Sequence, residues 1–373
     1  MDRDGTTTTG MRGGGYYDDH SEYQRRVAGT AAELIARCAD DVPPPDGGTF
    51  VVADYGCSTG RNSAASVRAA VSAVRARRPG LPVAAIHNDL PTNDWNELFA
   101  NLRAAQGPDG VLALASAVSF FEPAAPAGSV HLGMSFSAAH WLRRQPDVVV
   151  REGVYFCEAT GQARARLAAE ADADWTAFLA ARAADLAPGG RLLVQMVGTD
   201  PSADSGGGPR VTGRLLLRAM GEVAAQMARD GALDPAAVER YLLPVYARTP
   251  AEARRPLEDP DSPLREGFDV EVCRTDEVPN PYLDAWRADG DAGAYARAYA
   301  AFARAFTESS LREHLLAPGA AAADVDRLAD DFYARLTDRF AADPERDRFE
   351  DWTLTVVLAR RDGTSRVRHP SSG

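Results

Sequence analysis

Lysine is missing from this chain of 373 residues, and all 41 of its basic residues are arginine. Without lysine there can be no phosphate loop of the Walker A type, no Schiff base with pyridoxal phosphate and no lysine acting as a general base. Codon usage in a GC-rich genome explains the substitution of arginine for lysine. Together with the abundance of alanine, glycine and aspartate, it predicts a bacterial, specifically actinobacterial, origin.

Cysteine is scarce, and positive charge is in deficit. Four cysteines occur, none of them in a CxxC pair, which predicts the absence of a zinc site and a reducing, cytoplasmic location. The 53 acidic residues exceed the 41 basic ones by 12, and no basic run occurs, so nucleic acids and anionic membranes are unsuitable partners. Because no apolar run approaches 18 residues and no leader pattern is present, we expect neither a membrane span nor a signal peptide.

Strand and helix patterns alternate through the first 200 residues. Short apolar runs followed by glycine turns and amphipathic helices are typical of an α/β fold with a doubly wound parallel sheet. Two alternating segments near the C-terminus are expected to complete that sheet. The expected strands are 49–54, 82–87, 111–118, 130–136, 191–197, 268–276 and 352–360, and the expected helices of the first half are 21–38, 61–78, 94–105, 138–144 and 175–186.

The composition changes after residue 200, where a Ser/Gly/Pro loop precedes two alanine-rich, mostly helical stretches, 213–255 and 283–340. We interpret these stretches as a cap over the sheet. Their aromatic stripe (Tyr295, Tyr299, Phe302, Phe306, Leu311) faces the core or a pocket, and the core is favoured for most of it. The expected organisation is a flexible segment 1–20, a Rossmann-like core 21–200, a cap 201–345 that includes the core strand near 268–276, a final strand 346–362 and a flexible tail 363–373.

Polar residues follow the first three strands, where ligands bind in open α/β sheets. The turn from Asp54 to Asn62 contains Gly56 and Gly60 but is neither a GxGxxG motif nor a phosphate loop, and alone it fits a packing turn equally well. Asp89 ends the second strand, where a carboxylate can accept hydrogen bonds from two ribose hydroxyls, or else cap a helix. With Ser119 and Phe120 after the third strand, the pattern favours an adenosyl ligand with an amino-acid tail, S-adenosylmethionine.

Three long motifs resemble the SABATH family of methyltransferases. The segment from Tyr17 to Gln24 is similar to the family's Tyr-x-x-Asn-Ser-x-x-Gln, with His20 in place of the asparagine. Asp54-Tyr55-Gly56-Cys57-Ser58-x-Gly60-x-Asn62 resembles Asp-Leu-Gly-Cys-Ser-Ser-Gly-Pro-Asn. Asn88-Asp89-Leu90-Pro91-x-Asn93-Asp94-Trp95-Asn96 resembles Asn-Asp-Leu-Pro-x-Asn-Asp-Phe-Asn. Further matches at Ser137-x-x-His140-Trp141-Leu142, Pro188-Gly189-Gly190 and Pro244-x-Tyr246 extend the resemblance over nearly the whole chain.

The resemblance implies a class I, Rossmann-like methyltransferase sheet with a helical cap, which methylates the carboxylate of a small acid and forms a homodimer. It implies that the cofactor is S-adenosylmethionine and its product S-adenosylhomocysteine. The cofactor-lining residues that it implies are Tyr17, Ser21, Asp54, Gly56, Cys57, Asn62, Asp89, Leu90, Ser119 and Phe120. It places Gln24, His140 and Trp141 around the acceptor's carboxylate, although His140 taken alone is more typical of a structural histidine.

Carboxylate methylation requires geometry more than acid–base chemistry, because a carboxylic acid is already ionised at neutral pH. We therefore expect no general base, and we expect positioning by two neutral donors, the Gln24 amide and the Trp141 indole. The alternatives are an N-methyltransferase acting on a small heterocycle, a Rossmann oxidoreductase that binds NAD, and a non-catalytic binding module. The absence of GxGxxG argues against the oxidoreductase.

Two departures from the family pattern bear on the site. The family's tyrosine before its conserved tryptophan is absent, since the run here is Ser137-Ala138-Ala139-His140-Trp141. Some members also hold a divalent ion, but the corresponding positions here are Arg151 and 239–242 (Glu-Arg-Tyr-Leu). Two of those ligand positions are unsuitable for a metal, so we predict that none is bound.

Overall fold

The main element of the fold is a seven-stranded sheet with the strand order β3-β2-β1-β4-β5-β9-β8. The computed structural model describes residues 31–43, 45, 48–105, 110–150, 153–200 and 210–361. The strands of the sheet are β1 (Phe50–Tyr55), β2 (Val83–Asp89), β3 (Val111–Ala117), β4 (Val130–Phe136), β5 (Leu186–Val197), β8 (Phe268–Val278) and β9 (Asp351–Arg360). A separate two-stranded sheet pairs β6 (Thr199–Asp200) with β7 (Arg210–Val211).

Five of these strands run parallel. The topological switch point of the sheet lies between β1 and β4, because β2 and β3 follow on one side of β1 while β4 and β5 follow on the other. β1 pairs in parallel with β2 on one side and with β4 on the other, so the carboxyl ends of β1 and β4 open the crevice where ligands of such sheets bind. β9 is antiparallel to both β5 and β8. The structure thus confirms all seven predicted strands and the prediction that the last two complete the sheet.

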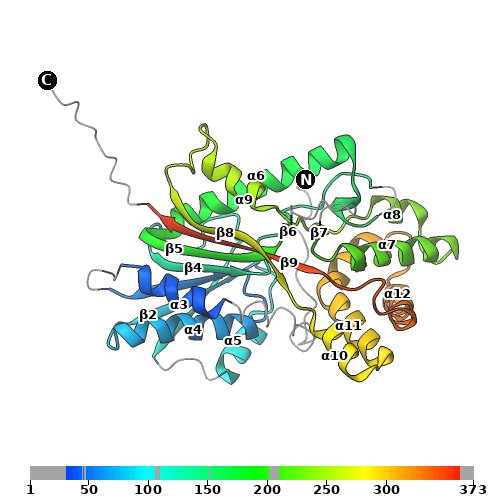
Figure 1. Ribbon diagram of the computed structural model, residues 1–373, viewed down its shortest axis with the longest axis horizontal. Coiled ribbons are helices and arrows are strands. Elements are labelled where there is room, and N and C mark those ends of the chain that lie inside the picture. The colour runs from blue at the N-terminus through cyan, green and yellow to red at the C-terminus, as the bar shows by residue number, and fades with distance from the viewer. Residues whose placement is uncertain are drawn as a thin grey trace.

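Two helical layers cover the sheet (Figure 1). On one face, α3 and α4 pack against a core that includes Val52, Met134 and Leu193. On the other face, α6 and α9 cover a second core around Tyr55, Trp175 and Phe178. The helices of these layers are α3 (Ala32–Asp41), α4 (Arg61–Arg77), α5 (Trp95–Ala104), α6 (Gly161–Asp185) and α9 (Pro250–Glu258), and a 3₁₀ turn η1 (Phe156–Glu158) precedes α6.

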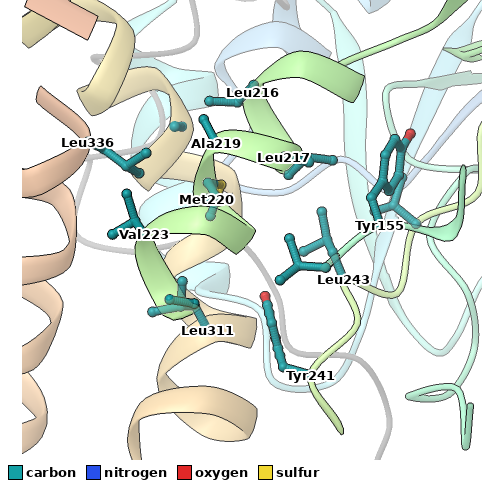
Figure 2. Close-up of a cluster of buried hydrophobic side chains, with 14 of the residues drawn as sticks. Tyr155, Leu216, Leu217, Ala219, Met220, Val223, Tyr241, Leu243, Leu311 and Leu336 are labelled. Carbon is teal, nitrogen blue, oxygen red and sulfur yellow. The ribbon is translucent and has the colours of Figure 1, made fainter. Parts of the chain in front are cut away.

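The remaining helices form a cap beside the carboxyl edge of the sheet, at the right of Figure 1. They are α7 (Arg214–Arg229), α8 (Pro235–Arg240), α10 (Pro281–Asp289), α11 (Ala292–Leu311), the π-helical turn η2 (Arg312–Leu316) and α12 (Ala322–Ala342). Figure 2 shows Leu216, Leu217 and Met220 of α7 among buried side chains from α11, α12 and the segment before α9. None of the helices in the described ranges is both long and apolar enough to cross a lipid bilayer.

The aromatic stripe of α11 lies in this cap core. Tyr295, Tyr299, Phe302 and Leu311 are each at most 4% exposed, and Phe306 is partly buried. The Tyr299 ring packs on Phe302 and Phe340, and its hydroxyl donates to the Asp347 carbonyl at 2.8 Å. The stripe therefore serves packing, as favoured from the sequence.

The predicted helix at 138–144 is wrong, because this segment forms a single turn closed by the Trp141 amide on the Ala138 carbonyl, at 3.0 Å, and then pairs with a distant segment. Trp141 forms an antiparallel bridge with Val245, and the Leu142 amide donates to the Pro244 carbonyl at 2.8 Å. A strand-like partner from a distant part of the chain thus replaces the internal hydrogen bonds that a helix would make. Alanine-rich composition favoured a helix, but this tertiary pairing overrides the local propensity.

Two predicted boundaries also differ. The helix expected from Trp175 begins at Gly161, and β5 begins at Leu186 rather than at Arg191. The Pro188-Gly189-Gly190 turn therefore lies inside the span of β5, where the pairing with β4 shifts register between Val130 and Leu132. The turn residues form an irregularity within the strand instead of preceding it.

Candidate active site

A sharp turn follows β1 at the crevice. Gly56 and Gly60 adopt left-handed backbone angles, with φ of 87° and 90°, and Ser58 between them has φ of 49°. Ser58 and Ser137 are the two non-glycine residues of the described ranges with positive φ, and both lie in loops of this site. Strained backbone of this kind persists where the surroundings fix it, which is common at ligand-binding loops.

The end of β2 holds this turn in place. The Asn88 carbonyl accepts hydrogen bonds from the amides of Gly56 and Cys57 at 2.9 and 3.0 Å. The two carboxylate oxygens of Asp89 accept from the amides of Ser58 and Leu90 at 2.7 and 2.8 Å. A carboxylate has about four acceptor positions, so each Asp89 oxygen keeps one for a ligand. The geometry suits the two hydroxyls of a ribose.

Asp54 lies at the start of the turn and is 4% exposed. Burial raises the pKa of its carboxyl to about 6; the Ser63 hydroxyl counteracts the rise, and the neighbouring Asp89 adds to it. The Ser63 hydroxyl also lies 2.8 Å from the His87 Nδ1, and burial lowers the pKa of His87 to about 4, so that this histidine is neutral. At neutral pH Asp54 is thus an anion with no cationic partner among the described residues, and a ligand's ammonium would stabilise it.

Most of the predicted cofactor residues after β1 surround one hollow. Burial, followed by the charges of Asp89 and Asp54, raises the pKa of the Cys57 thiol well above its usual value, so Cys57 is present as an unreactive thiol. The hollow is lined by Asp54, Gly56, Cys57, Ser58, Thr59, Gly60, Arg61, Asn62, Ser63 and Phe136.

Ser119 and Phe120 follow β3 and lie beside this turn. A Cβ added to Gly56 would lie 3.7 Å from the Phe120 Cε1, which places the phenyl ring against the glycine. The loop is anchored from behind by a fully buried ion pair, Arg182–Asp185, at 2.7 Å. Arg182 donates to the Phe120 and Glu122 carbonyls at 2.6 and 2.9 Å.

The loop after β4 carries the predicted acceptor residues. A Cβ added to Gly56 would lie 2.3 Å from the Ala138 Cβ, so this loop packs directly on the turn after β1. His140 is 6% exposed and Trp141 is 8% exposed. The Val197 amide points at the His140 Nδ1, at 3.5 Å, and this places the ring proton on Nε2. Burial and the charge of Arg248 lower the pKa of His140 to about 3, so its ring is a neutral donor at physiological pH.

The Trp141 indole N–H is buried and finds no acceptor in the described part of the chain. A buried donor without a partner costs about 1–3 kcal/mol, and such a group in a native structure calls for an explanation. A ligand oxygen would satisfy it.

Four sequence-predicted residues fall outside the described ranges: Tyr17, Ser21, Gln24 and Arg151. At the positions of the family's divalent ion, Tyr241 and Leu242 are buried in the cap core, where neither can bind a cation. Among the described residues, no group of three or more His, Cys, Asp and Glu side chains is placed to hold a metal ion. That no metal is bound stays a prediction, and the mechanism below uses none.

Comparison with known proteins identifies the family. The model of the SAM-dependent carboxyl methyltransferases, the SABATH family, matches residues 6–361. The chain belongs to this family. It is a SAM-dependent carboxyl O-methyltransferase, which excludes the oxidoreductase, and its fold is that of a class I methyltransferase.

Two curated relatives and one solved structure illustrate the match. O-methyltransferase acrG of Aspergillus aculeatus is 28% identical over 291 residues, 76% of this chain and 75% of the relative. Farnesoic acid carboxyl-O-methyltransferase of Arabidopsis thaliana is 28% identical over 270 residues, 68% of this chain and 75% of the relative. The structure of loganic acid methyltransferase with SAH has a TM-score of 0.75 and 22% identity, and the match covers 95% of this chain and 99% of that one.

Several residues that support the methyltransferase site were missed in the sequence. They hold loops of the candidate site through backbone carbonyls: Asn88 and Arg182 hold the loop after β3, and Arg248 holds the loop after β4 at Ala139. Arg182 and Asp185 are spaced i, i+3 in a predicted helix. This spacing predicts an ion pair between them, but it does not predict that the pair is buried. For Arg248 the sequence holds no such signal, because its partners are distant in the chain.

The contact between Gly56 and Ala138 generates the first prediction. Gly56→Ala should destabilise the fold by about 1–2 kcal/mol for the left-handed backbone and about 1–3 kcal/mol more for the steric clash. Gly128→Ala is the matched control, since Gly128 has φ of 68° and open space around it. Urea unfolding of both variants measures the difference. Equal losses would show that the two loops are not in tight contact.

Proposed function

We propose that the acceptor is a small, largely apolar carboxylic acid, and that its carboxylate accepts hydrogen bonds from the Trp141 indole N–H and the His140 imidazole N–H. The observation that carries this proposal is the buried Trp141 N–H, which has no acceptor among the described residues, beside a neutral histidine donor. The rings are tilted by 32°, with centroids 6.0 Å apart. Gln24, which the family resemblance assigns to the same carboxylate, is proposed as a further donor.

The surroundings of Trp141 support an apolar acid. Trp141 belongs to the cap core, together with Tyr155, Phe156 and Tyr246. The names of three relatives refer to farnesoic, jasmonic and gibberellic acid, each an acid with a large hydrocarbon part. We propose an acceptor of this general kind for the present chain.

For the cofactor we propose that Asp89 binds the ribose, Asp54 the amino-acid end, and the 119–120 loop the adenine. Leu90, Gly56, Cys57 and Asn62 would complete the walls, with Tyr17 and Ser21 contributed from the N-terminal motif. Two observations support this assignment. The Asp89 oxygens have free acceptor positions, and the raised pKa of Asp54 marks a buried anion that a ligand's ammonium would stabilise.

The mechanism that we propose is an in-line transfer without a general base. Bound S-adenosylmethionine supplies an electrophilic methyl group on its sulfonium. Trp141 and His140 orient the carboxylate and leave one oxygen lone pair free to attack, and the packed loops exclude water. Positioning of this kind can contribute roughly 7–11 kcal/mol. His140 cannot act as a base, because its pKa of about 3 makes it too weak an acceptor at neutral pH.

We further propose a homodimer in the cytoplasm, with a core over 21–200 and a cap over 201–345 that is interrupted by α9 and β8, both of which belong to the sheet and its cover. All four cysteines are free thiols, which supports a reducing compartment. The dimer rests on the family resemblance alone.

The test of the proposed function is turnover of a panel of acids. Farnesoic, jasmonic, gibberellic and loganic acid would each be incubated with S-adenosylmethionine, and methyl esters would be detected by mass spectrometry. For an acid that reacts, kcat should be nearly flat from about pH 6 to 9, because the carboxylate ionises near 4. A rate that follows a group titrating near 7 would contradict the mechanism without a base.

Trp141→Phe removes the indole N–H and retains most of the ring. A hydrogen bond to a charged group contributes about 1.5–3 kcal/mol, so kcat/KM should fall by about 10- to 150-fold. The affinity for S-adenosylhomocysteine, measured by calorimetry, should stay unchanged. Trp95→Phe is the matched control, because Trp95 donates to the Pro91 carbonyl and stands where the family has phenylalanine. If the two variants behave alike, the Trp141 N–H does not hold the acceptor.

Asp54 predicts how cofactor affinity depends on pH. Its pKa in the free protein is about 6, and the ammonium of the ligand binds the ionised form. Affinity for S-adenosylhomocysteine should therefore be constant above about pH 7 and fall about tenfold per pH unit below 6. Calorimetry from pH 5 to 7.5 measures it. Asp54→Asn should bind more weakly at pH 7.5 and lose this pH dependence; a variant that keeps it would assign the titration to another group, such as Asp89.

A further inference from the structure

Arg248 is a buried arginine directly behind the acceptor loop. It is 2% exposed, and it follows the segment that pairs with Trp141. Its Nη1 donates to the Ala139 carbonyl at 3.2 Å and its Nη2 to the Ala171 carbonyl at 2.6 Å. The guanidinium lies 5.5 Å from the centroid of the Trp175 ring, so it is wedged between the acceptor loop and α6.

No carboxylate within the described ranges forms an ion pair with this guanidinium. The acids that influence it most are Asp174 and Glu252. Asp174 accepts from the Arg143 amide at 2.7 Å, and Glu252 accepts from the Tyr246 hydroxyl and the Thr249 amide at 2.7 and 2.8 Å. Both acids thus form hydrogen bonds with groups other than Arg248, whereas Arg248 donates to backbone carbonyls, which carry no negative charge. A buried charge left without a counter-ion is costly, and a function that uses the charge explains why it is kept.

The positive charge of Arg248 reaches the acceptor loop. Burial lowers the pKa of Arg248 to about 10, which leaves the guanidinium charged at neutral pH. After burial itself, the charge of Arg248 is the second cause of the low pKa of His140. The same potential that repels a proton from His140 attracts an anion bound next to it.

We infer that Arg248 is a selectivity residue: from its position on the Ala139 carbonyl, behind the acceptor loop, its charge favours a carboxylate over a neutral ligand of the same shape. This inference rests on the proposed function of the His140–Trp141 loop as the acceptor site. Because the guanidinium lies behind the backbone, it attracts the acid without taking up the lone pair that attacks.

The charge of the acceptor is lost during the reaction, and this determines what Arg248 does to the kinetics. The carboxylate attacks the methyl carbon, the new C–O bond forms as the C–S bond breaks, and the electron pair returns to sulfur. Anion and sulfonium become neutral ester and thioether. A positive potential therefore stabilises the bound acid more than the transition state, so it lowers KM and does not raise kcat.

The test compares each panel acid with its own methyl ester, which has the same skeleton but no charge. Binding to the native protein, Arg248→Gln and Arg248→Lys is measured by calorimetry with S-adenosylhomocysteine present. Arg248→Gln should weaken binding of the acid by about ten- to thirtyfold, the order expected when one buried unit charge close to the site is removed at an effective dielectric constant of about 20. Binding of the ester should change less than about twofold, and Arg248→Lys should restore most of the acid's affinity.

Arg255→Gln is the matched control. It removes the same charge from α9, where Arg255 is half-exposed and paired with Asp172 at 2.6 Å, and it should leave acid binding unchanged. In steady-state assays, Arg248→Gln should raise the KM of the acid without lowering kcat.

Each outcome has a defined meaning. Equal weakening of acid and ester in Arg248→Gln would overturn the selectivity role and leave a packing role. Unchanged acid affinity would overturn the inference entirely, and so would failure of the native protein to bind any panel acid at millimolar concentration. If an acid binds but is not methylated, the proposed function fails, while the comparison of acid with ester still decides the role of Arg248.

Discussion

The site depends on one steric constraint, the contact of the bare Cα of Gly56 with the methyl group of Ala138. It joins the turn after β1 to the loop after β4, and the topological switch point of the sheet lies between these two strands. Because no side chain separates them, a ligand on the turn and a ligand against Trp141 must lie close together. Methyl transfer requires that closeness, since sulfur, carbon and oxygen have to be in line within bonding reach.

Buried polar groups keep these loops in shape. The loops are irregular, so their backbone donors and acceptors need partners that strands and helices would otherwise provide. Asn88 supplies them for the turn after β1, Arg182 for the loop after β3, and Arg248 for the loop after β4. Asn88 lies in β2 and Arg182 in α6, whereas Arg248 lies in the segment before α9 and bridges to Gly198 after β5. The ligand-facing residues can then vary little in position, although they lie on loops.

The sequence predicted what depends on contiguous residues. The strand runs are apolar and bounded by turns, and the Asp54–Asn62 and Asn88–Asn96 motifs place their residues at adjacent strand ends. Prediction failed where distant partners decide the structure. The 138–144 segment is not helical because Trp141 pairs with Val245. β5 includes the glycine turn at 188–190 because β4 pairs with the strand on both sides of that turn. Arg182 and Arg248 went unnoticed for the same reason, since their carbonyl partners lie 60 or more residues away in the sequence.

The titratable groups differ between the proposed cofactor site and the proposed acceptor site. The difference fits a reaction in which a cation and an anion form two neutral products. In the cofactor site that we propose, Asp54 and Asp89 are acids that suit a cationic ligand. In the proposed acceptor site, His140 is neutral and Arg248 carries the positive charge, which suits an anion. Under this proposal each site attracts the oppositely charged reactant, and neither site attracts the uncharged ester. The electrostatic attraction that favours binding of the acid would then be lost when the ester forms, which favours release of the ester.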